Sequence, residues 1–172
     1  TRLPHYRYPP AEGQLTSEND RETIIALTEK GRQQIANEDG IGYYGEVNAD
    51  GLPHGYGRQV FEDGGIYDGE WKNGLHHGEG TYLWTWGDRY TGDWREGKKH
   101  GQGIGTYADG GRFVGTMRHD LRNGWGKFHY HFGDEYRGYY ESDLKAAGTW
   151  HYGNGECRVC RWVLSEEGKR MH

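Results

Sequence analysis

From residue 43 onward, large apolar residues alternate with glycine and polar residues, and the alternation returns at a fixed interval. Tyr67, Tyr90, Phe113 and Tyr136 stand 23 residues apart. Each is followed two residues later by glycine and four residues later by a large side chain, namely Trp71, Trp94, Met117 or Tyr140. Positions i, i+2 and i+4 share one face of a β-strand. The pattern therefore predicts a strand at the start of each 23-residue unit.

The rest of each unit predicts a turn and a second strand. Asn73-Gly74 is a strong hairpin-turn sequence. Alternate residues from Gly80 through Tyr82 and Trp84 to Trp86 again share one face, and Gly87-Asp88 would turn the chain into the next unit. We therefore expect a mainly β fold, an elongated single-layer antiparallel sheet of about five stacked hairpins, because repeats of this length stack on their neighbours.

Residues 1–40 have a different pattern. Three prolines, Pro4, Pro9 and Pro10, favour an extended arm at the N-terminus. The segment 18–36, capped by Ser17, predicts one short helix. We divide the chain into an arm plus helix at 1–40, repeats at 41–158, and a closing strand and tail at 159–172.

The repeats resemble the MORN repeat (membrane occupation and recognition nexus). The motifs that carry the resemblance are "YDGEWKNGLHHGEGTY", "YTGDWREGKKHGQGIGTY" and "FVGTMRHDLRNGWGKFHY", and it covers roughly residues 43–158. The chain departs from the pattern at Met117, Asn123, Ala147 and Trp150. The resemblance implies a grooved single-layer sheet and a role as a scaffold or interaction module. Family members have been linked to membranes, to cytoskeletal and ciliary assemblies, and to attached enzyme domains.

Composition and charge disfavour several classes of function. Hydrophobic residues make up only 33% of the 172 residues, and they include 14 tyrosines and 7 tryptophans. The chain also has 31 glycines. We therefore expect aromatic rings to pack on glycines rather than in a thick aliphatic core. The net charge of −5 disfavours a nucleic-acid partner. No apolar run approaches the roughly 20 residues of a membrane-spanning helix. The chain has no catalytic motif, so we expect no enzyme activity and no small-molecule substrate.

A single-layer sheet cannot bury both faces by itself, and an exposed apolar surface marks an interaction site. We therefore expect a partner segment to lie in an aromatic groove, which residues 18–36 of the chain itself could cover in part. The arm would add contacts through Tyr6 and Tyr8. The groove residues are Tyr67, Trp71, Tyr90, Trp94, Phe113, Tyr136 and Tyr140.

Four other features have a functional and a structural interpretation. Histidines recur once per unit and could form a metal site, but partner ligands are not evident; these are His54, His77 and His100. Cys157 and Cys160 have the spacing of a redox motif or half a zinc site, with packing as the alternative. The glycines of 101–111 follow from the repeat and lack the lysine of a phosphate loop. Basic clusters at 98–100, 118–122 and 158–170 could touch anionic lipid, with solvent or a protein partner as the preferred alternative. We expect no metal and no cofactor.

These observations favour a non-enzymatic structural subunit that binds protein partners in a stable assembly. The alternatives are a peripheral membrane tether and, more weakly, an accessory module of a separate enzyme. We expect an intracellular protein. A mitochondrial complex is slightly preferred over a ciliary or cytoskeletal one because the sequence starts at Thr1 rather than at methionine.

Overall fold

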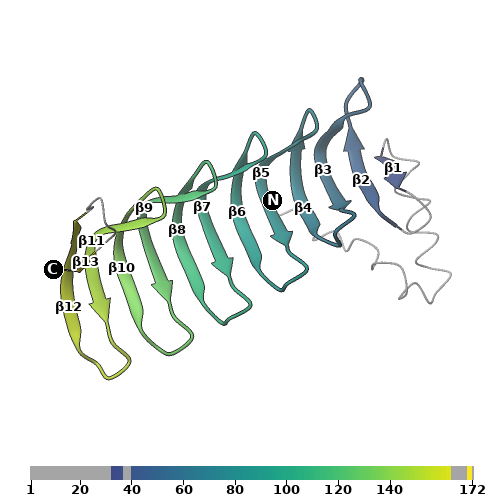
Figure 1. The fold of residues 1–172 in the computed structure, drawn as a ribbon. Coiled ribbons are helices and arrows are strands. Elements are labelled where there is room, and N and C mark those ends of the chain that lie inside the picture. The colour runs from purple at the N-terminus through teal and green to yellow at the C-terminus, as the bar shows by residue number, and fades with distance from the viewer. Residues whose placement is uncertain (1–31, 37–39, 164–169, 172) are drawn as a thin grey trace, which may run out of the picture.

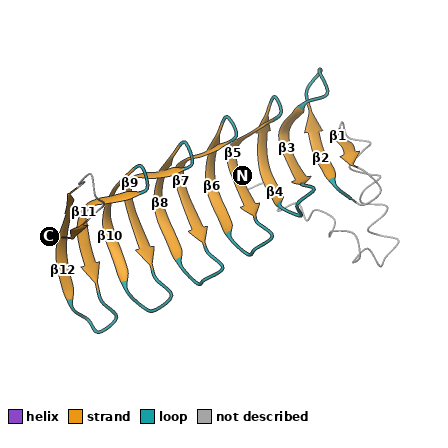
Figure 2. Cartoon of the chain, in the orientation of Figure 1, coloured by secondary structure: helices purple, strands orange, loops and turns teal. Residues whose placement is uncertain are grey.

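The protein is a row of antiparallel hairpins that stand side by side along one axis (Figure 1). The computed structural model describes residues 32–36, 40–163 and 170–171. Each described strand pairs with the strands before and after it in sequence, so the order in the sheet is the order in the chain. Eleven strands form the main body, β2 to β12, and the short strands β1 and β13 pair at its two ends. In Figure 2 the described residues are strands joined by short loops.

The strand bounds follow the 23-residue interval. They are β1 Arg32–Ala36, β2 Gly42–Val47, β3 Pro53–Val60, β4 Ile66–Lys72, β5 Leu75–Leu83, β6 Arg89–Arg95, β7 Lys98–Thr106, β8 Arg112–Arg118, β9 Leu121–His129, β10 Glu135–Glu141, β11 Leu144–His151, β12 Cys157–Val163 and β13 Arg170–Met171. The predicted single-layer antiparallel sheet is therefore confirmed. In the part of the chain that the structure describes, no helix is long and apolar enough to span a membrane.

Two kinds of connection alternate along the sheet, one at each end of the strands. At one end, from β4 onward, lie two-residue turns such as Asn73-Gly74, where φ is 48° and 82°, whereas the longer loop 48–52 joins β2 and β3 there. Positive φ at both residues is the type I′ geometry, whose twist matches that of the flanking strands, so the predicted turn is confirmed. At the other end lie five-residue loops such as 84–88, closed by the Trp84 N–H donating to the Asp88 carbonyl at 2.9 Å.

Two elements differ from the sequence expectation. The second strand of the unit was expected to reach Trp86, but β5 ends at Leu83, because Trp84 already makes the loop hydrogen bond to Asp88. The expected helix over 18–36 is wrong at residues 32–36, which form β1 against β2. The open edge of β2 offers a row of backbone donors and acceptors, and pairing with it outweighs local helix propensity. The extended arm and the rest of that helix lie outside the described residues.

Candidate functional site

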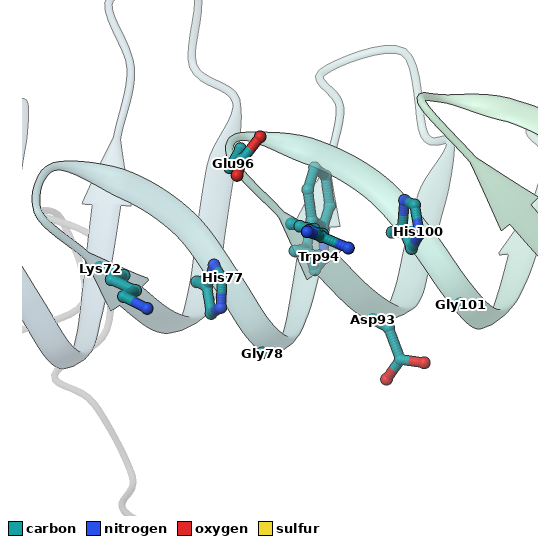
Figure 3. Close-up of a pocket in the computed structure, with 9 residues that line it drawn as sticks. Lys72, His77, Gly78, Asp93, Trp94, Glu96, His100 and Gly101 are labelled. Atoms are coloured by element: carbon teal, nitrogen blue, oxygen red, sulfur yellow. The ribbon is translucent and has the colours of Figure 1, made fainter.

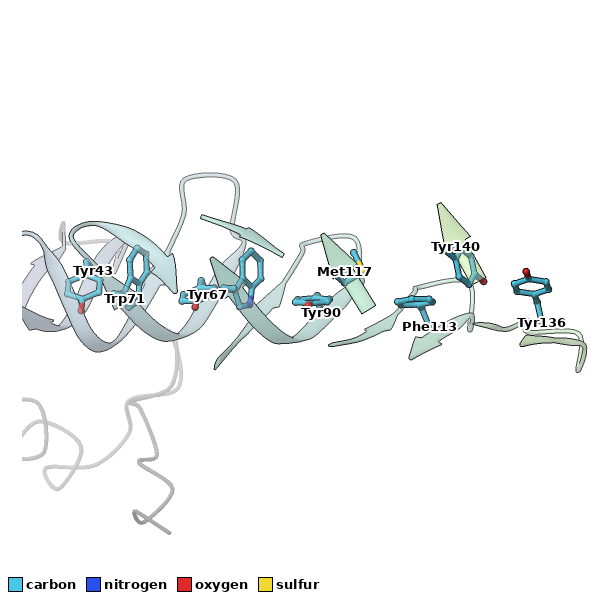
Figure 4. Packing of buried hydrophobic residues seen from close by; sticks show 9 residues of the cluster. Tyr43, Tyr67, Trp71, Tyr90, Phe113, Met117, Tyr136 and Tyr140 are labelled. Atoms are coloured by element: carbon cyan, nitrogen blue, oxygen red, sulfur yellow. The ribbon is translucent and has the colours of Figure 1, made fainter. Parts of the chain in front are cut away.

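The anchor rings and their partners form one continuous column along a single face of the sheet, which we call the ring face (Figure 4). Its members come from alternate strands, and rings from neighbouring units meet edge to face. Tyr67 lies 5.1 Å from Trp71 and 5.2 Å from Trp94, measured between ring centroids. The ring column consists of Tyr43, Tyr67, Trp71, Tyr90, Trp94, Phe113, Met117, Tyr136 and Tyr140.

The seven residues predicted to line an exposed groove all belong to this column, and all seven are buried, with Tyr67, Tyr136 and Tyr140 at 0% exposure. The expectation that they form an exposed apolar surface is therefore wrong. The reason is the bare backbone beneath them: the Tyr67 ring lies so close to Gly80 that a Cβ there would stand 2.3 Å from its hydroxyl. Tyr6 and Tyr8 lie outside the described residues.

Most polar atoms of the column are satisfied within the sheet. The Tyr67 hydroxyl donates to the Glu70 carbonyl at 2.9 Å, and the Trp71 and Trp94 indoles donate to the Gly57 and Gly80 carbonyls at 3.0 and 3.1 Å. Burial raises the pKa of the Tyr67 phenol and raises the pKa of Tyr136 to about 12. These phenols stay neutral at physiological pH, and the column works as a core rather than as reactive chemistry.

A second row of residues lies over the ring column, nine positions after each anchor: His76, Lys99, Arg122 and Lys145. The Lys99 ammonium is 5.3 Å from the Trp84 ring centroid, and the Arg122 guanidinium is 5.2 Å from that of Tyr140. The Lys145 ammonium is 5.0 Å from the Trp150 centroid. We call Lys99, Arg122 and Lys145 the basic row. Cation–π attraction holds each of them on the aromatic surface.

Sequence reasoning placed Lys99 and Arg122 in basic clusters, but it missed Lys145 and the 23-residue interval that relates the three residues. We considered instead the position ten residues after each anchor, because histidine occupies it in two units, as His77 and His100. Half-buried rings that pack on the ring column border the basic row and are the aromatic surface that solvent reaches on this face. They are Phe61, Tyr82, Trp84, Tyr107, Phe128, Tyr130 and Trp150.

The recurrent histidines are not brought together as a ligand set. His77 and His100 line a shallow hollow of about 460 Å³ with Lys72, Asp93 and Glu96 (Figure 3), while His54 lies 3.2 Å from the Asn73 side-chain oxygen. No cluster of three metal-ligating side chains occurs among the described residues. The segment 101–111 forms most of β7 and the following loop.

The two cysteines are both free and lie in different surroundings. Cys157 is exposed, with its sulfur 4.0 Å from His151 Nε2, whereas Cys160 is 2% exposed and belongs to the core. Their separation of three residues along β12 places them on opposite faces of the sheet, as expected from strand geometry.

On the face opposite the ring face, Trp125 of β9 and Tyr139 of β10 are direct cross-strand neighbours. Their exposures are 67% and 46%, unusually high for two adjacent large rings. Other large side chains are exposed at the loops, where Trp86 is 61% and Phe132 59% exposed. These four rings and Tyr56, which is 46% exposed, are the exposed aromatic residues among the described ones, whereas those of the ring column are buried.

Comparison with known proteins agrees with the geometry. The family model described as the MORN repeat matches residues 43–66, 67–89 and 90–112. No curated protein matches the chain. Among solved structures, a chain from "SAS-4 (dCPAP) TCP domain in complex with a Proline Rich Motif of Ana2 (dSTIL) of Drosophila Melanogaster" aligns at 12% identity, covering 74% of this chain and 88% of that chain, with a TM-score of 0.34. Residues 43–112 therefore match the MORN repeat three times in succession, and the same hairpin geometry continues through β8 to β11.

Proposed function

We propose that the chain is a non-enzymatic scaffold subunit that holds protein partners in a stable assembly. MORN repeats are commonly protein-interaction or membrane-binding modules, so these are the first two functions to compare. The observation that favours a protein partner is the exposed pair Trp125 and Tyr139 on paired strands of a rigid sheet. Tryptophan and tyrosine are the residue types that most often dominate binding energy at protein interfaces.

The architecture supports the same role. The ring column stabilises the sheet from one face, so in the described residues the opposite face is not needed to bury a core. A surface of that kind can give up its hydration to a partner without cost to the fold. The sheet is also long relative to one hairpin, so several partners could attach along it.

A pull-down from native extract with a high-salt wash tests this proposal. The double variant Trp125→Ser and Tyr139→Ser should lose the retained proteins, because apolar burial resists salt whereas exposed ion pairs do not. The matched control is Leu83→Ser, which removes a side chain of 43% exposure at a distant strand end. Retention of the same proteins by the double variant would overturn the proposal.

The compartment stays a prediction, mitochondrial first and ciliary or cytoskeletal second, and the identity of the retained proteins would decide it. The weaker alternative, an accessory module of a separate enzyme, also stays a prediction. In that case enzyme activity would appear only when the chain is mixed with that enzyme.

A second candidate, peripheral membrane binding, is favoured by one observation. Trp86 and Phe132 belong to the β5–β6 and β9–β10 loops, which lie at the same end of the strands, and are 61% and 59% exposed. Aromatic side chains anchor proteins at the interface between lipid headgroups and acyl chains. Co-sedimentation with vesicles that contain anionic lipid, lost on changing both residues to serine, would favour this candidate, and no sedimentation would exclude it.

A further inference from the structure

We infer that the ring face binds an acidic, extended segment of a partner protein through the basic row. This inference rests on the proposed function, because it takes the partner to be a protein. Lys99, Arg122 and Lys145 come from β7, β9 and β11, one from each of three successive hairpins. The repeat therefore places the three positive charges in a line at even spacing.

The acidic side chains of strands β4 to β11 are confined to one face of the sheet, whereas basic side chains occur on both faces. In the described strands β4 to β11, the positions that face the same way as the ring column include the basic row and no aspartate or glutamate. Every acidic residue of these strands has the opposite parity: Asp68, Glu70, Glu79, Asp93, Glu135 and Glu141. One face of a chain with a net charge of −5 is therefore cationic.

Among the described residues, acidic groups near the basic row lie in the turns and loops at the strand ends, where Asp134 accepts a hydrogen bond from Trp150 Nε1 at 2.9 Å. Asp143 accepts a hydrogen bond from Arg122 Nε at 2.8 Å, and Asp120 accepts one from the Lys99 backbone N–H at 2.9 Å. The Arg122 guanidinium has five N–H donors, so it can bind a second carboxylate beside Asp143. Each row cation is half-buried against rings, where a carboxylate is attracted more strongly than in bulk water.

The spacing selects the conformation of the segment. Successive cations are two strands apart, about 9.6 Å at the usual strand separation. A polyproline II chain advances about 9.3 Å in three residues and returns the third side chain to the same side. An extended β-strand covers a similar length, but its third residue points to the opposite side. An α-helix needs seven residues and about 10.5 Å, a mismatch that grows over two intervals.

The surface beside the cations suits the same conformation. Half-buried rings, among them Tyr107, Phe128, Tyr130 and Trp150, flank the row, and aromatic surfaces bind polyproline II segments. The expected ligand is therefore a segment of at least seven residues in polyproline II conformation, with a carboxylate at every third position.

The test is fluorescence-anisotropy titration of the full chain with three labelled peptides. The first repeats Glu-Pro-Pro with glutamate at positions 1, 4 and 7. The second has the same composition but consecutive glutamates, and the third replaces glutamate with lysine. We expect the first to bind at least about tenfold more tightly than the second, to weaken with salt, and the third not to bind. Equal binding of the first two peptides would overturn the spacing argument.

Variants locate the site. Lys99→Gln, Arg122→Gln and Lys145→Gln together should abolish binding, whereas changing three exposed bases of the opposite face, Lys98, Arg112 and Arg118, to glutamine removes the same charge and should leave binding within about twofold. If the triple variant unfolds, the single variant Arg122→Glu replaces it, and its melting curve shows whether it is folded. This variant should bind the first glutamate peptide more weakly than the parent chain does. Unchanged binding by a folded row variant would overturn the inference.

Two outcomes separate this inference from others. If the row variant loses binding to vesicles of phosphatidylserine and phosphatidylcholine while no peptide binds the parent chain, the row contacts membrane and the inference fails. If no peptide binds, but the high-salt pull-down still depends on Trp125 and Tyr139, the scaffold function stands and only the acidic ligand is wrong.

Discussion

His76 lies flat on Tyr67, with ring centroids 3.7 Å apart and planes 11° apart. Burial lowers the pKa of His76 from 6.5 to about 4, because a protonated imidazole would sit among aromatic rings away from water. The folded state therefore binds this proton less readily than the unfolded state. The stability that follows is fully present above pH 6.5 and is lost as pH falls from about 6.5 to about 4.

The first prediction follows from that linkage. Between pH 7.5 and pH 4, the parent chain should lose up to about 3 kcal/mol more unfolding free energy than His76→Phe, which keeps a ring without a proton to bind. Urea unfolding of both proteins at the two pH values measures the difference, and the comparison cancels the contribution of carboxylates. Parallel loss in the two proteins would show that His76 does not titrate in this range.

Gly80 and Gly105 are both buried strand glycines, but only one supports a ring of the column. A Cβ at Gly80 would stand 2.3 Å from the Tyr67 hydroxyl, and Trp94, hydrogen-bonded to the Gly80 carbonyl, prevents that ring from moving away. A Cβ at Gly105 would stand 3.2 Å from the Tyr107 hydroxyl, the far end of a side chain that can shift.

Gly80→Ala should therefore destabilise the fold by about 3 kcal/mol and Gly105→Ala by less than about 1 kcal/mol. Urea denaturation of each variant measures the change. Equal effects would mean that strand propensity, rather than contact with the ring, makes glycine necessary at these positions.

The hairpins could be predicted from sequence because the interval between Tyr67 and Tyr90 fixes which side chains share a face. The exposure of the column rings could not be predicted from sequence. It depends on how closely each ring packs on the glycine beneath it and on how much of the ring the next hairpin covers. Lys99 and Arg122 were recognised only as members of basic clusters, because the residue at this position of the repeat varies among histidine, lysine and arginine and the repetition was not evident from residue identity. The helix expected at residues 32–36 failed because β2 offered a free edge, a tertiary effect that local propensity does not contain.

Tyr140 stands where earlier units have Trp71 and Trp94, but its hydroxyl is buried with no hydrogen-bond partner in the described residues. A buried hydroxyl without a partner is costly. Tyr140→Phe should therefore raise the unfolding free energy by about 1 kcal/mol. Tyr136→Phe should lower it by a similar amount, about 1 kcal/mol, because the Tyr136 hydroxyl donates to the Tyr139 carbonyl at 3.2 Å. Thermal unfolding compares the two, and a loss of stability in both would show that the Tyr140 hydroxyl is satisfied in solution.

The cysteines of β12 should differ in reactivity because one thiol is exposed and the other belongs to the core. Cys157 is accessible beside His151, whereas Cys160 is 2% exposed. Three residues of extended strand separate their Cα atoms by about 10 Å, beyond the span of a disulfide, so mild oxidation cannot close a bond within the chain without breaking the strand.

Iodoacetamide should label one thiol per native chain and both in urea, as mass spectrometry would count. Oxidation should instead link two chains through Cys157, and Cys157→Ser should prevent both the native label and the link. Rapid native labelling of two thiols would show that β12 opens readily, and the end of the ring column with it.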